Sequence, residues 1–432
     1  MTTPVEFWRC LGSILFESGD AAWLSKKPTC GNNNANGRRG HRIRRGIVGT
    51  GGDLESGGRR LQSYRILRRG RRRALHHSHH VAIFEITPEK DSAAAIEELA
   101  AVLDSQHAEH MMPSVVLPLD DTSLWLCSRV QPSTRWILAG ASRHNAELAI
   151  DKRKQIQAAT AVGFRVPPTS FAATTDGLVD CVGEYPVILR PAYAVSVSEG
   201  RLHKGRNWIC SDEAELQRAW SGWNGRELLM VQPFLEGTGE GVFGLATDRG
   251  VVAWSAHRRL RMMNPHGSGS SACISQEIPN DLKRPVAAFV RSCDWRGMFM
   301  IELLRTADKG LWFVEFNGRA WGSMALSRRQ SLEYPAWTVK LALNSQFVPD
   351  NNRDFTEEVV CRNLGRELMH VLFVLRGPQS RAIRKWPSFW RTLIELLLID
   401  RKSSFYNWRR EDWRVFFSDC WYTIREQVFK SH

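Results

Sequence analysis

The pattern of apolar and polar positions predicts mixed helices and strands from residue 81 onward. HHVAIFEIT predicts a strand, DSAAAIEELAAVLDSQ predicts a helix with an Asp/Ser start, and SVVLPLDD predicts a buried strand that ends at polar residues. WILAG adds another short strand. This β-α-β order indicates a small α/β domain over residues 81–149.

A second unit starts at Asp151-Lys152, and the pattern changes again near residue 345. DKRKQIQAATAVGFRVPPTSFA predicts a helix, a stop at Gly163 and a strand marked by proline. We expect one α+β domain over residues 150–345. Beyond it, RELMHVLFVLRG, SFWRTLIELLLI and DWRVFFSDCWYTIREQVFK are apolar at helical spacing, which predicts a mainly helical region over 346–432.

Two interpretations of the aromatic residues in this C-terminal region stay open. They can pack in a core. Alternatively, the helices can dock on a membrane surface or a partner, because basic amphipathic helices bind anionic surfaces.

Charge separates residues 1–80 from the rest of the chain. They hold 16 Lys plus Arg against 5 Asp plus Glu, whereas the other 352 residues hold 43 against 40. Segments such as GNNNANGRRGHRIRRG contain few apolar residues, so we expect a basic, disordered, low-complexity extension. Arg-rich segments can neutralise phosphates. A nucleic-acid partner is therefore expected only through this tail, for which an extension without a role is the alternative.

The remaining composition indicates a globular, soluble protein. The 432 residues are 43% hydrophobic and 24% charged, which suits two or three domains. The sequence contains no run of about 18 apolar residues, so no membrane span is predicted. The N-terminus is a poor secretory signal. The nine cysteines are scattered without a C-x-x-C pair, so neither a zinc site nor a disulfide framework is predicted. A reducing cytoplasm fits this usage best.

The candidate chemistry lies in a predicted β-hairpin, FMIELLRTADKGLWFVEFNGRAWGS. If Ala307 pairs with Gly310 in the turn, Glu302 falls opposite Glu315, with the two Cβ atoms roughly 5 Å apart. Like charges in that position destabilise a sheet, which indicates a cation between them. Asn317 and Arg319 continue on the same face, because strand side chains alternate. A Glu, Glu, Asn set suits Mg²⁺ that bridges phosphates.

The string Glu315-Phe-Asn317-Gly-Arg319-Ala-Trp-Gly-Ser, with Glu302 upstream, resembles the metal-binding end of ATP-grasp enzymes. It is most similar to the branch of the carbamoyl-phosphate synthase large subunit. The resemblance implies two α+β subdomains that clasp ATP after a pre-ATP-grasp domain. That domain is expected to be truncated at its front, because the basic tail takes the place of its first strand and helix. The acidic pair and Asn317 would hold Mg²⁺ or Mn²⁺, and Arg319 would bind phosphate or the substrate carboxylate.

The same resemblance implies roles for four further segments. Lys152 lies at the start of the small subdomain, and Arg190 in YPVILRPAY would contact the ATP phosphates. AVSVSEGRLHKGRNW would be the phosphate-covering loop, with its glycines sparse and Lys204 supplying charge. In LLMVQPFLEGTGEGVFG, the resemblance places adenine against Gln232, Pro233, Phe234 and Leu235, and the ribose near Glu240.

The fourth segment, AWSAHRRLRMMNPHGSGSSACISQE, resembles the Arg-rich and Gly/Ser stretch of the same branch. Arg258, Arg259 or Arg261 would clamp the substrate carboxylate or the γ-phosphate, and the Gly/Ser loop would approach an acylphosphate. Alternation puts Arg259 and Arg261 on one face and Arg258 on the other. No P-loop and no G-x-G-x-x-G motif competes for the nucleotide.

The expected function is therefore an ADP-forming ligase that joins a carboxylate to an amine, or to a thiol, through an acylphosphate. The alternative from a different class is a catalytically idle ATP-binding regulatory or scaffold protein on the same fold. The sparse glycines of the phosphate loop favour the alternative, while the intact Glu, Glu, Asn set favours the ligase. The sequence names neither substrate and leaves the oligomeric state open.

Overall fold

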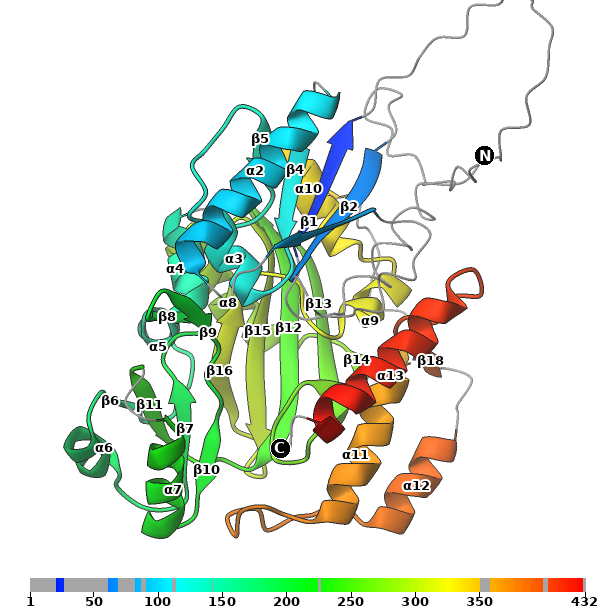
Figure 1. Cartoon of the computed structure of the whole chain (residues 1–432). Helices are drawn as coiled ribbons and strands as arrows, with labels where there is room; N and C mark the ends of the chain where they lie inside the picture. The colour runs from blue at the N-terminus through cyan, green and yellow to red at the C-terminus, as the bar shows by residue number, and fades with distance from the viewer. Residues whose placement is uncertain are drawn as a thin grey trace, which may run out of the picture.

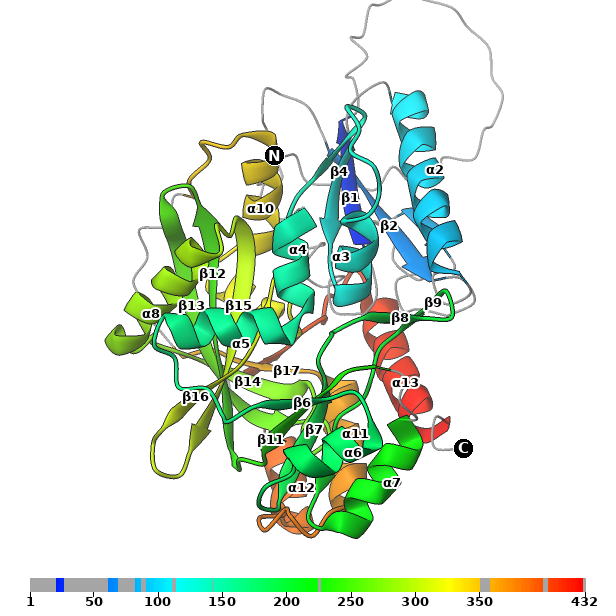
Figure 2. The ribbon, with the colours of Figure 1, turned by 90° about the vertical axis from the view of Figure 1, so that its left-hand side faces the viewer.

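The structure is a computed structural model of the whole chain, shown in two views in Figures 1 and 2. The residues described below are 21–26, 61–68, 82–86, 91–110, 114–141, 143–223, 227–349, 358–398 and 403–429.

The N-terminal part of the described chain forms a five-stranded sheet in the order β3-β2-β1-β4-β5. β1 is antiparallel to both of its neighbours, whereas β2 and β3, and β4 and β5, pair in parallel. The strands are β1 (Ala21–Lys26), β2 (Leu61–Arg68), β3 (Ala82–Ile86), β4 (Ser114–Pro118) and β5 (Trp136–Leu138).

Strands β1 and β2 correct the expectation that residues 1–80 contribute no structure. Their backbones supply the central strand of the first sheet and one of its neighbours. The expected disorder of the other residues in 1–80 lies outside the described part of the chain.

Three helices follow in this first domain: α2 (Ser92–His110), α3 (Asp121–Cys127) and α4 (Arg143–Ile150). α3 begins directly after β4 because Asp120 caps it. The Asp120 carboxylate accepts from the Ser123 N–H at 2.8 Å, and the Ser123 hydroxyl accepts from the Asp120 N–H at 3.0 Å. This capping box fixes Asp121 in the first turn of α3.

A smaller four-stranded sheet has the order β10-β7-β11-β6 and packs on two helices (Figure 2). Its elements are β6 (Ser170–Ala172), α6 (Thr175–Cys181), β7 (Val187–Pro191), β10 (Trp208–Cys210), α7 (Glu213–Trp223) and β11 (Leu229–Pro233). α5 (Lys152–Ala161) leads into this subdomain, with Asp151 as its N-cap. Between β7 and β10 stands a two-stranded hairpin of β8 (Ser196–Ser198) and β9 (Arg201–His203).

The largest sheet has seven strands in the order β16-β15-β12-β13-β14-β17-β18. Only β17 and β18 pair in parallel. Helix α8 and the aromatic side chains of Phe289, Phe299 and Phe316 lie in a buried cluster with this sheet. Its strands are β12 (Gly237–Thr247), β13 (Gly250–Met262), β14 (Ser270–Gln276), β15 (Gly297–Thr306), β16 (Leu311–Asn317), β17 (Val360–Arg362) and β18 (Ser403–Phe405).

The region after residue 345 is partly helical, as expected, but it also contributes β17 and β18 to the large sheet. The helices that follow the small-sheet subdomain are α8 (Asn280–Ser292), α9 (Met324–Arg329), α10 (Tyr334–Leu343), α11 (Leu364–Arg376), α12 (Phe389–Leu397) and α13 (Trp413–Phe429). None of the described helices is long and apolar enough to cross a membrane.

Candidate active site

The hairpin of β15 and β16 brings Glu302 directly opposite Glu315, which confirms the predicted pairing. The predicted turn is wrong, because the Thr306 N–H, not that of Ala307, bonds to the Gly310 carbonyl at 3.0 Å. Lys309 adopts a left-handed φ of 62° in this longer turn. A register shift between Glu302 and Leu303 restores the expected alignment toward the end of the hairpin.

Each of the opposed carboxylates has an arginine partner. Arg190 Nη2 lies 2.7 Å from Glu315, and Arg259 Nη2 lies 2.6 Å from Glu302. The two guanidiniums come from different sheets, since Arg190 lies in β7 and Arg259 lies in β13. The hairpin therefore carries its like charges as two separate ion pairs at the junction of the subdomains.

Glycines on β12 allow Arg259 to reach Glu302 across that strand. β12 lies between β13 and β15, and an added Cβ at Gly239 would stand 2.7 Å from Arg259 Cδ. At Gly241, directly opposite Glu302, an added Cβ would stand 3.1 Å from His257 Nε2. Only strand positions without a side chain leave this space.

Two more cations surround Glu315. Burial alone would raise the pKa of Glu315, but the charges of Arg190, Lys152 and Arg319 outweigh burial and hold the pKa below its ordinary value. The Lys152 ammonium is itself buried, which lowers its pKa, and it donates to the Pro191 carbonyl at 3.2 Å. The Asn317 amide approaches Glu315 Oε1 at 3.2 Å.

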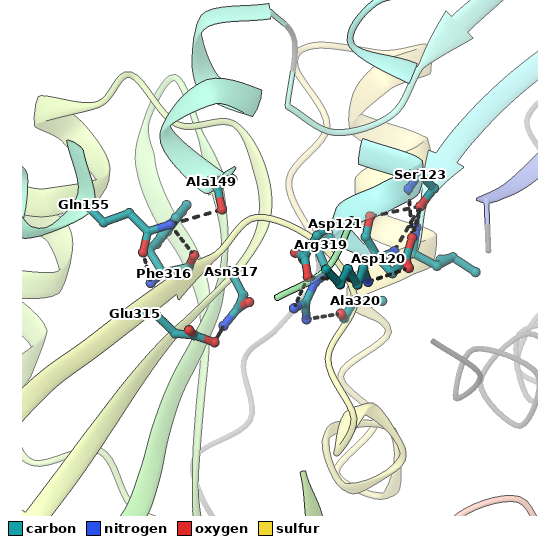
Figure 3. A network of polar contacts seen from close by, with 12 residues as sticks. Asp120, Asp121, Ser123, Ala149, Gln155, Glu315, Phe316, Asn317, Arg319 and Ala320 are labelled. Carbon is teal, nitrogen blue, oxygen red and sulfur yellow. Dashed lines mark hydrogen bonds and ion pairs between the residues drawn. The ribbon is translucent and has the colours of Figure 1, made fainter. Parts of the chain in front are cut away.

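Gln155 of α5 fixes the backbone of β16 between the two predicted ligands. Its amide donates to the Phe316 carbonyl at 3.0 Å and accepts from the Phe316 N–H at 3.0 Å (Figure 3). It also donates to the Ala149 carbonyl. The sequence analysis missed this residue, since a helical glutamine carries no local signal of what it contacts.

Arg319 is held by the N-terminal domain. It forms a two-pronged ion pair with Asp121 at 2.9 and 3.1 Å (Figure 3). Burial raises the pKa of Asp121, but Arg319 and then Lys204 lower it to about 2. Lys204 lies 3.0 Å from Asp120. The polar end of SVVLPLDD marked Asp120 and Asp121 in the sequence, but their basic partners could not be inferred from it.

A cleft of about 1320 Å³ lies between the four-stranded and the seven-stranded sheets, and eleven of the fourteen predicted site residues line it. Lys152, Lys204 and Glu240 do not line it. Lys152 lies behind Glu315, and Lys204 faces Asp120. The eleven are Arg190, Gln232, Pro233, Phe234, Leu235, Arg259, Arg261, Glu302, Glu315, Asn317 and Arg319.

The structure does not support the ribose assignment of Glu240. It alternates with Gly239 and Gly241 and so projects from the opposite face of β12. There it binds Arg305 through both carboxylate oxygens at 2.5 and 2.9 Å and is buried. The expectation failed because the sequence does not show which face of β12 lines the cleft.

The backbone after β11 leaves two polar groups turned away from β7. The Phe234 N–H donates to the Pro186 carbonyl at 2.9 Å, toward β7. Since backbone groups alternate along an extended chain, the Pro233 carbonyl and the Leu235 N–H face away from β7. Within the described strands, β6 pairs with β11 only as far as Val231. Gln232 is buried and donates to Thr169 at 2.8 Å.

Arg259 and Arg261 both line the cleft and Arg258 does not, as alternation predicted. Arg261, however, is already bound by Glu367 of α11 at 2.9 and 3.1 Å. Its guanidinium is therefore tied to the C-terminal helices, which the sequence did not indicate.

His257 is a cleft residue that the sequence analysis overlooked. It is 2% exposed, and its Nδ1 lies 2.8 Å from the hydroxyl of Ser323. Burial, and then the charge of Arg259, lower the pKa of His257 to about 3, so the imidazole is neutral. The buried Nε2 atom has no hydrogen-bond partner among the described residues. His257 could have been predicted as a cleft residue, because it lies two residues before Arg259 and therefore on the same face of the strand.

The donor set suits a hard divalent cation. Among the described residues, no group of three or more His, Cys, Asp or Glu side chains is arranged to hold a metal. Two carboxylates and an amide oxygen are nevertheless hard ligands of the kind Mg²⁺ takes together with waters and phosphates. Arg259 binds Glu302 through the Oε1 atom, and Glu302 itself lines the cleft.

Comparisons with known proteins identify the architecture. No protein-family model matches this sequence, and no curated protein sequence matches it. An L-amino acid ligase from Bacillus licheniformis is 14% identical, with 61% of this chain and 64% of that chain covered and a TM-score of 0.46. The chain thus spans about two thirds of the first structures that it matches.

Among the structures with a TM-score of 0.50 are two biotin carboxylase structures. One is a biotin carboxylase from Campylobacter jejuni as a β-γ-ATP complex, 16% identical over 66% of each chain. The other is the biotin carboxylase domain of Hydrogenobacter thermophilus 2-oxoglutarate carboxylase with MgADP, ADP and bicarbonate, 14% identical over 68% of this chain and 67% of that one. With its two sheets clasping one cleft, the chain has the ATP-grasp fold.

Proposed function

We propose that this protein is an ATP- and Mg²⁺-dependent ligase that joins a carboxylate to an amine or thiol. The observation that carries the proposal is the opposed pair Glu302 and Glu315 in a cleft lined by arginines. Two hard carboxylates, each beside an arginine that can also bind a phosphate, suit a divalent metal and phosphates together. Bound β-γ-ATP and MgADP in two structures of the same fold support it.

In the proposed reaction, a substrate carboxylate oxygen attacks the γ-phosphorus of ATP, and the bond to the β-phosphate oxygen breaks to release ADP. The amine then attacks the acylphosphate carbon, loses a proton and expels phosphate, which leaves an amide. Mg²⁺ held by Glu302, Glu315 and Asn317 would supply positive charge to the phosphates.

The residues of the chain supply positioning and charge, which is what phosphoryl transfer mainly needs. Arg190 and Arg259 would move from the carboxylates toward phosphate or substrate oxygens when these enter. Lys152 and Arg319 keep Glu315 ionised. The Pro233 carbonyl and the Leu235 N–H would receive the adenine amine and ring nitrogen.

The test is Glu315→Gln, which keeps the side-chain shape and removes the charge. We expect Mg²⁺-dependent ADP formation to fall by at least about 100-fold, the usual cost of losing a main electrostatic group. The matched control is Glu333→Gln. Glu333 also pairs with an arginine, at 3.0 Å, and is similarly buried, but it does not line the cleft. Unchanged ADP formation in Glu315→Gln would show that the metal assignment is wrong.

One observation favours the idle alternative. The β8–β9 hairpin has Gly200 at its turn and Gly205 after it. With only two glycines in this segment, few backbone N–H groups can approach a phosphate without a side chain in the way. Equilibrium ATP binding measured beside ADP release on a panel of carboxylates and amines separates the two functions. Mg²⁺-dependent ATP binding without turnover on any pair would support the alternative.

A further inference from the structure

The C-terminal helices carry an apolar surface that the proposed reaction does not use. Of fifteen exposed large apolar side chains among the described residues, eleven lie between residues 368 and 421. We call these eleven the aromatic face. They are Leu368, Leu372, Leu375, Trp390, Ile394, Leu397, Leu398, Trp408, Trp413, Phe417 and Trp421.

Nine of the eleven follow helical spacing within α11, α12 and α13, so each of these helices presents one stripe. Leu398 directly follows α12, and Trp408 precedes α13. A helix turns by about 100° per residue, which places Trp413, Phe417 and Trp421 within an arc of about 80° on α13. Buried Val415 lies about 160° around α13 from the middle of this stripe, and buried Phe416 and Cys420 lie beside one edge of it. One side of the helix therefore packs in a core, while the stripe stays exposed.

Helices α11 and α12 repeat the arrangement. Leu368, Leu372 and Leu375 lie within about 60° on α11, and Trp390, Ile394 and Leu397 lie within about 60° on α12. α11 packs against both α12 and α13, so the three helices that carry the stripes form one group on one side of the molecule (Figure 1).

Exposed arginines border every stripe. On each helix an exposed arginine directly follows an exposed apolar residue of the stripe: Arg376, Arg391 and Arg414. Each of these arginines lies less than about 80° around the helix from the edge of its stripe. In the described part of 358–429, eight Lys or Arg but only Glu358 and Glu411 among the acids are exposed. The eight are Arg376, Arg381, Arg384, Lys385, Arg391, Arg410, Arg414 and Arg425.

We propose that the aromatic face docks this protein on the surface of an anionic lipid bilayer. The four exposed tryptophans, between 46% and 70% exposed, are the residues that favour the boundary between headgroups and acyl chains. The bordering arginines complement anionic headgroups and can reach them while their stems cover apolar surface. The helices would lie along the surface, since none of those described can span a bilayer.

The proposal stands apart from the ligase reaction, because the aromatic face lies outside the cleft lining. The test uses the full chain and flotation with phosphatidylcholine vesicles, with and without phosphatidylglycerol. We expect binding only to the anionic vesicles, weakened by salt, which screens charge. The combined variant Trp390→Ala, Trp413→Ala and Trp421→Ala should bind at least about tenfold more weakly.

Matched controls come from exposed residues elsewhere on the chain. Val179→Ala, Val197→Ala and Val348→Ala remove apolar groups outside the aromatic face and should leave binding unchanged. A charge variant, Arg376→Glu, Arg414→Glu and Arg425→Glu, should also lose binding. Its control changes the equally exposed Arg201, Arg284 and Arg296 to Glu. Thermal melts confirm that each variant is folded.

Three results would overturn the proposal. Wild-type protein that ignores anionic vesicles excludes lipid docking. Equal binding of the tryptophan variant and wild type would assign the interaction to other basic residues, such as those in residues 1–80. A wild-type dimer in sedimentation that the tryptophan variant splits would mean that a second copy covers the aromatic face.

Discussion

Gly239 decides where the side chain of Arg259 can lie, and Gly241 leaves room for the rings of Phe243 and His257. The arginine crosses β12 to reach Glu302, and a methyl group at Gly239 would stand 2.7 Å from its Cδ. The side chain could then no longer lie flat on the sheet. At residue scale, the cleft thus depends on two positions without any functional group.

We predict that Gly239→Ala lowers stability by about 1–3 kcal/mol, the usual cost of overpacking. ADP formation should fall by about tenfold or more, because displaced catalytic groups lose orientation. Gly183→Ala is the control, since an added Cβ there meets nothing within 4 Å. Chemical denaturation and a coupled ADP assay measure both effects. Full activity in Gly239→Ala would mean that Arg259 does not need this path.

His257 gives the cleft a dependence on pH. Its pKa in the folded protein is about 3, below the ordinary 6.5, because it is buried. A depressed histidine pKa means that the unfolded chain binds the proton first. Stability is therefore full above pH 6.5 and falls as the pH drops toward 3, by at most ~1.4 kcal/mol per pH unit.

We predict that His257→Gln flattens the fall in unfolding free energy between pH 6.5 and pH 3. The exposed His144→Gln serves as the control and should keep the wild-type slope. Urea denaturation at several pH values measures the slope. A variant slope equal to that of wild type would assign the acid sensitivity to other groups.

The residue types of the site were largely predictable, but their partners were not. Glu302, Glu315, Asn317 and Arg190 stood out because their types and spacing match a metal and phosphate site. The partners of Arg319 and Arg261 lie far along the chain, 198 residues away at Asp121 and 106 at Glu367. Local pattern carries no information on such distances.

At the scale of elements, α3 and the hairpin end are joined through one ion pair. Asp121 sits in the first turn of α3, and Arg319 follows β16. Both side chains are mostly buried, with exposures of 15% and 19%. Removing one partner of such a pair leaves the other charge buried and unpaired.

We predict that Asp121→Asn destabilises the protein by about 3 kcal/mol. Asp104→Asn, which breaks an exposed pair with Arg135, should cost less than about 1 kcal/mol. Acid should act in the same direction on wild type. The pKa of Asp121 is lowered from 3.8 to about 2, so its contribution is present above pH 3.8 and disappears toward pH 2. Equal costs for the two variants would contradict this role of Asp121.

In the β15–β16 hairpin, the pairing of Glu302 with Glu315 was predicted correctly although the predicted turn was one residue too short. The expected turn put Leu303 opposite Val314, whereas the structure pairs Leu303 with Phe313. The one-residue shift near Glu302 cancels the difference in turn length. Bulges of this kind are set by packing against neighbouring strands, which the hairpin sequence alone does not contain.

At the scale of the whole molecule, Glu367 ties the C-terminal helices to the cleft. It is fully buried in α11 and binds Arg261 of β13, Arg362 of β17 and the Ser271 hydroxyl. The expected boundary near residue 345 is therefore crossed by a buried charge network. Helical spacing predicted these helices, but it could not show that β17 and β18 extend the large sheet.

We predict that Glu367→Gln loosens the C-terminal helices together with the cleft. Two buried guanidiniums would lose their counter-charge, which costs about 3–5 kcal/mol. Hydrogen exchange should rise in α11 and α13 and also in β13 near Arg261. The control is Glu395→Gln, whose half-exposed carboxylate also contacts Arg261, at 3.4 Å, and should cost less than about 1 kcal/mol. Faster exchange confined to α11 and α13 would mean that these helices dock on the ATP-grasp core without controlling its cleft.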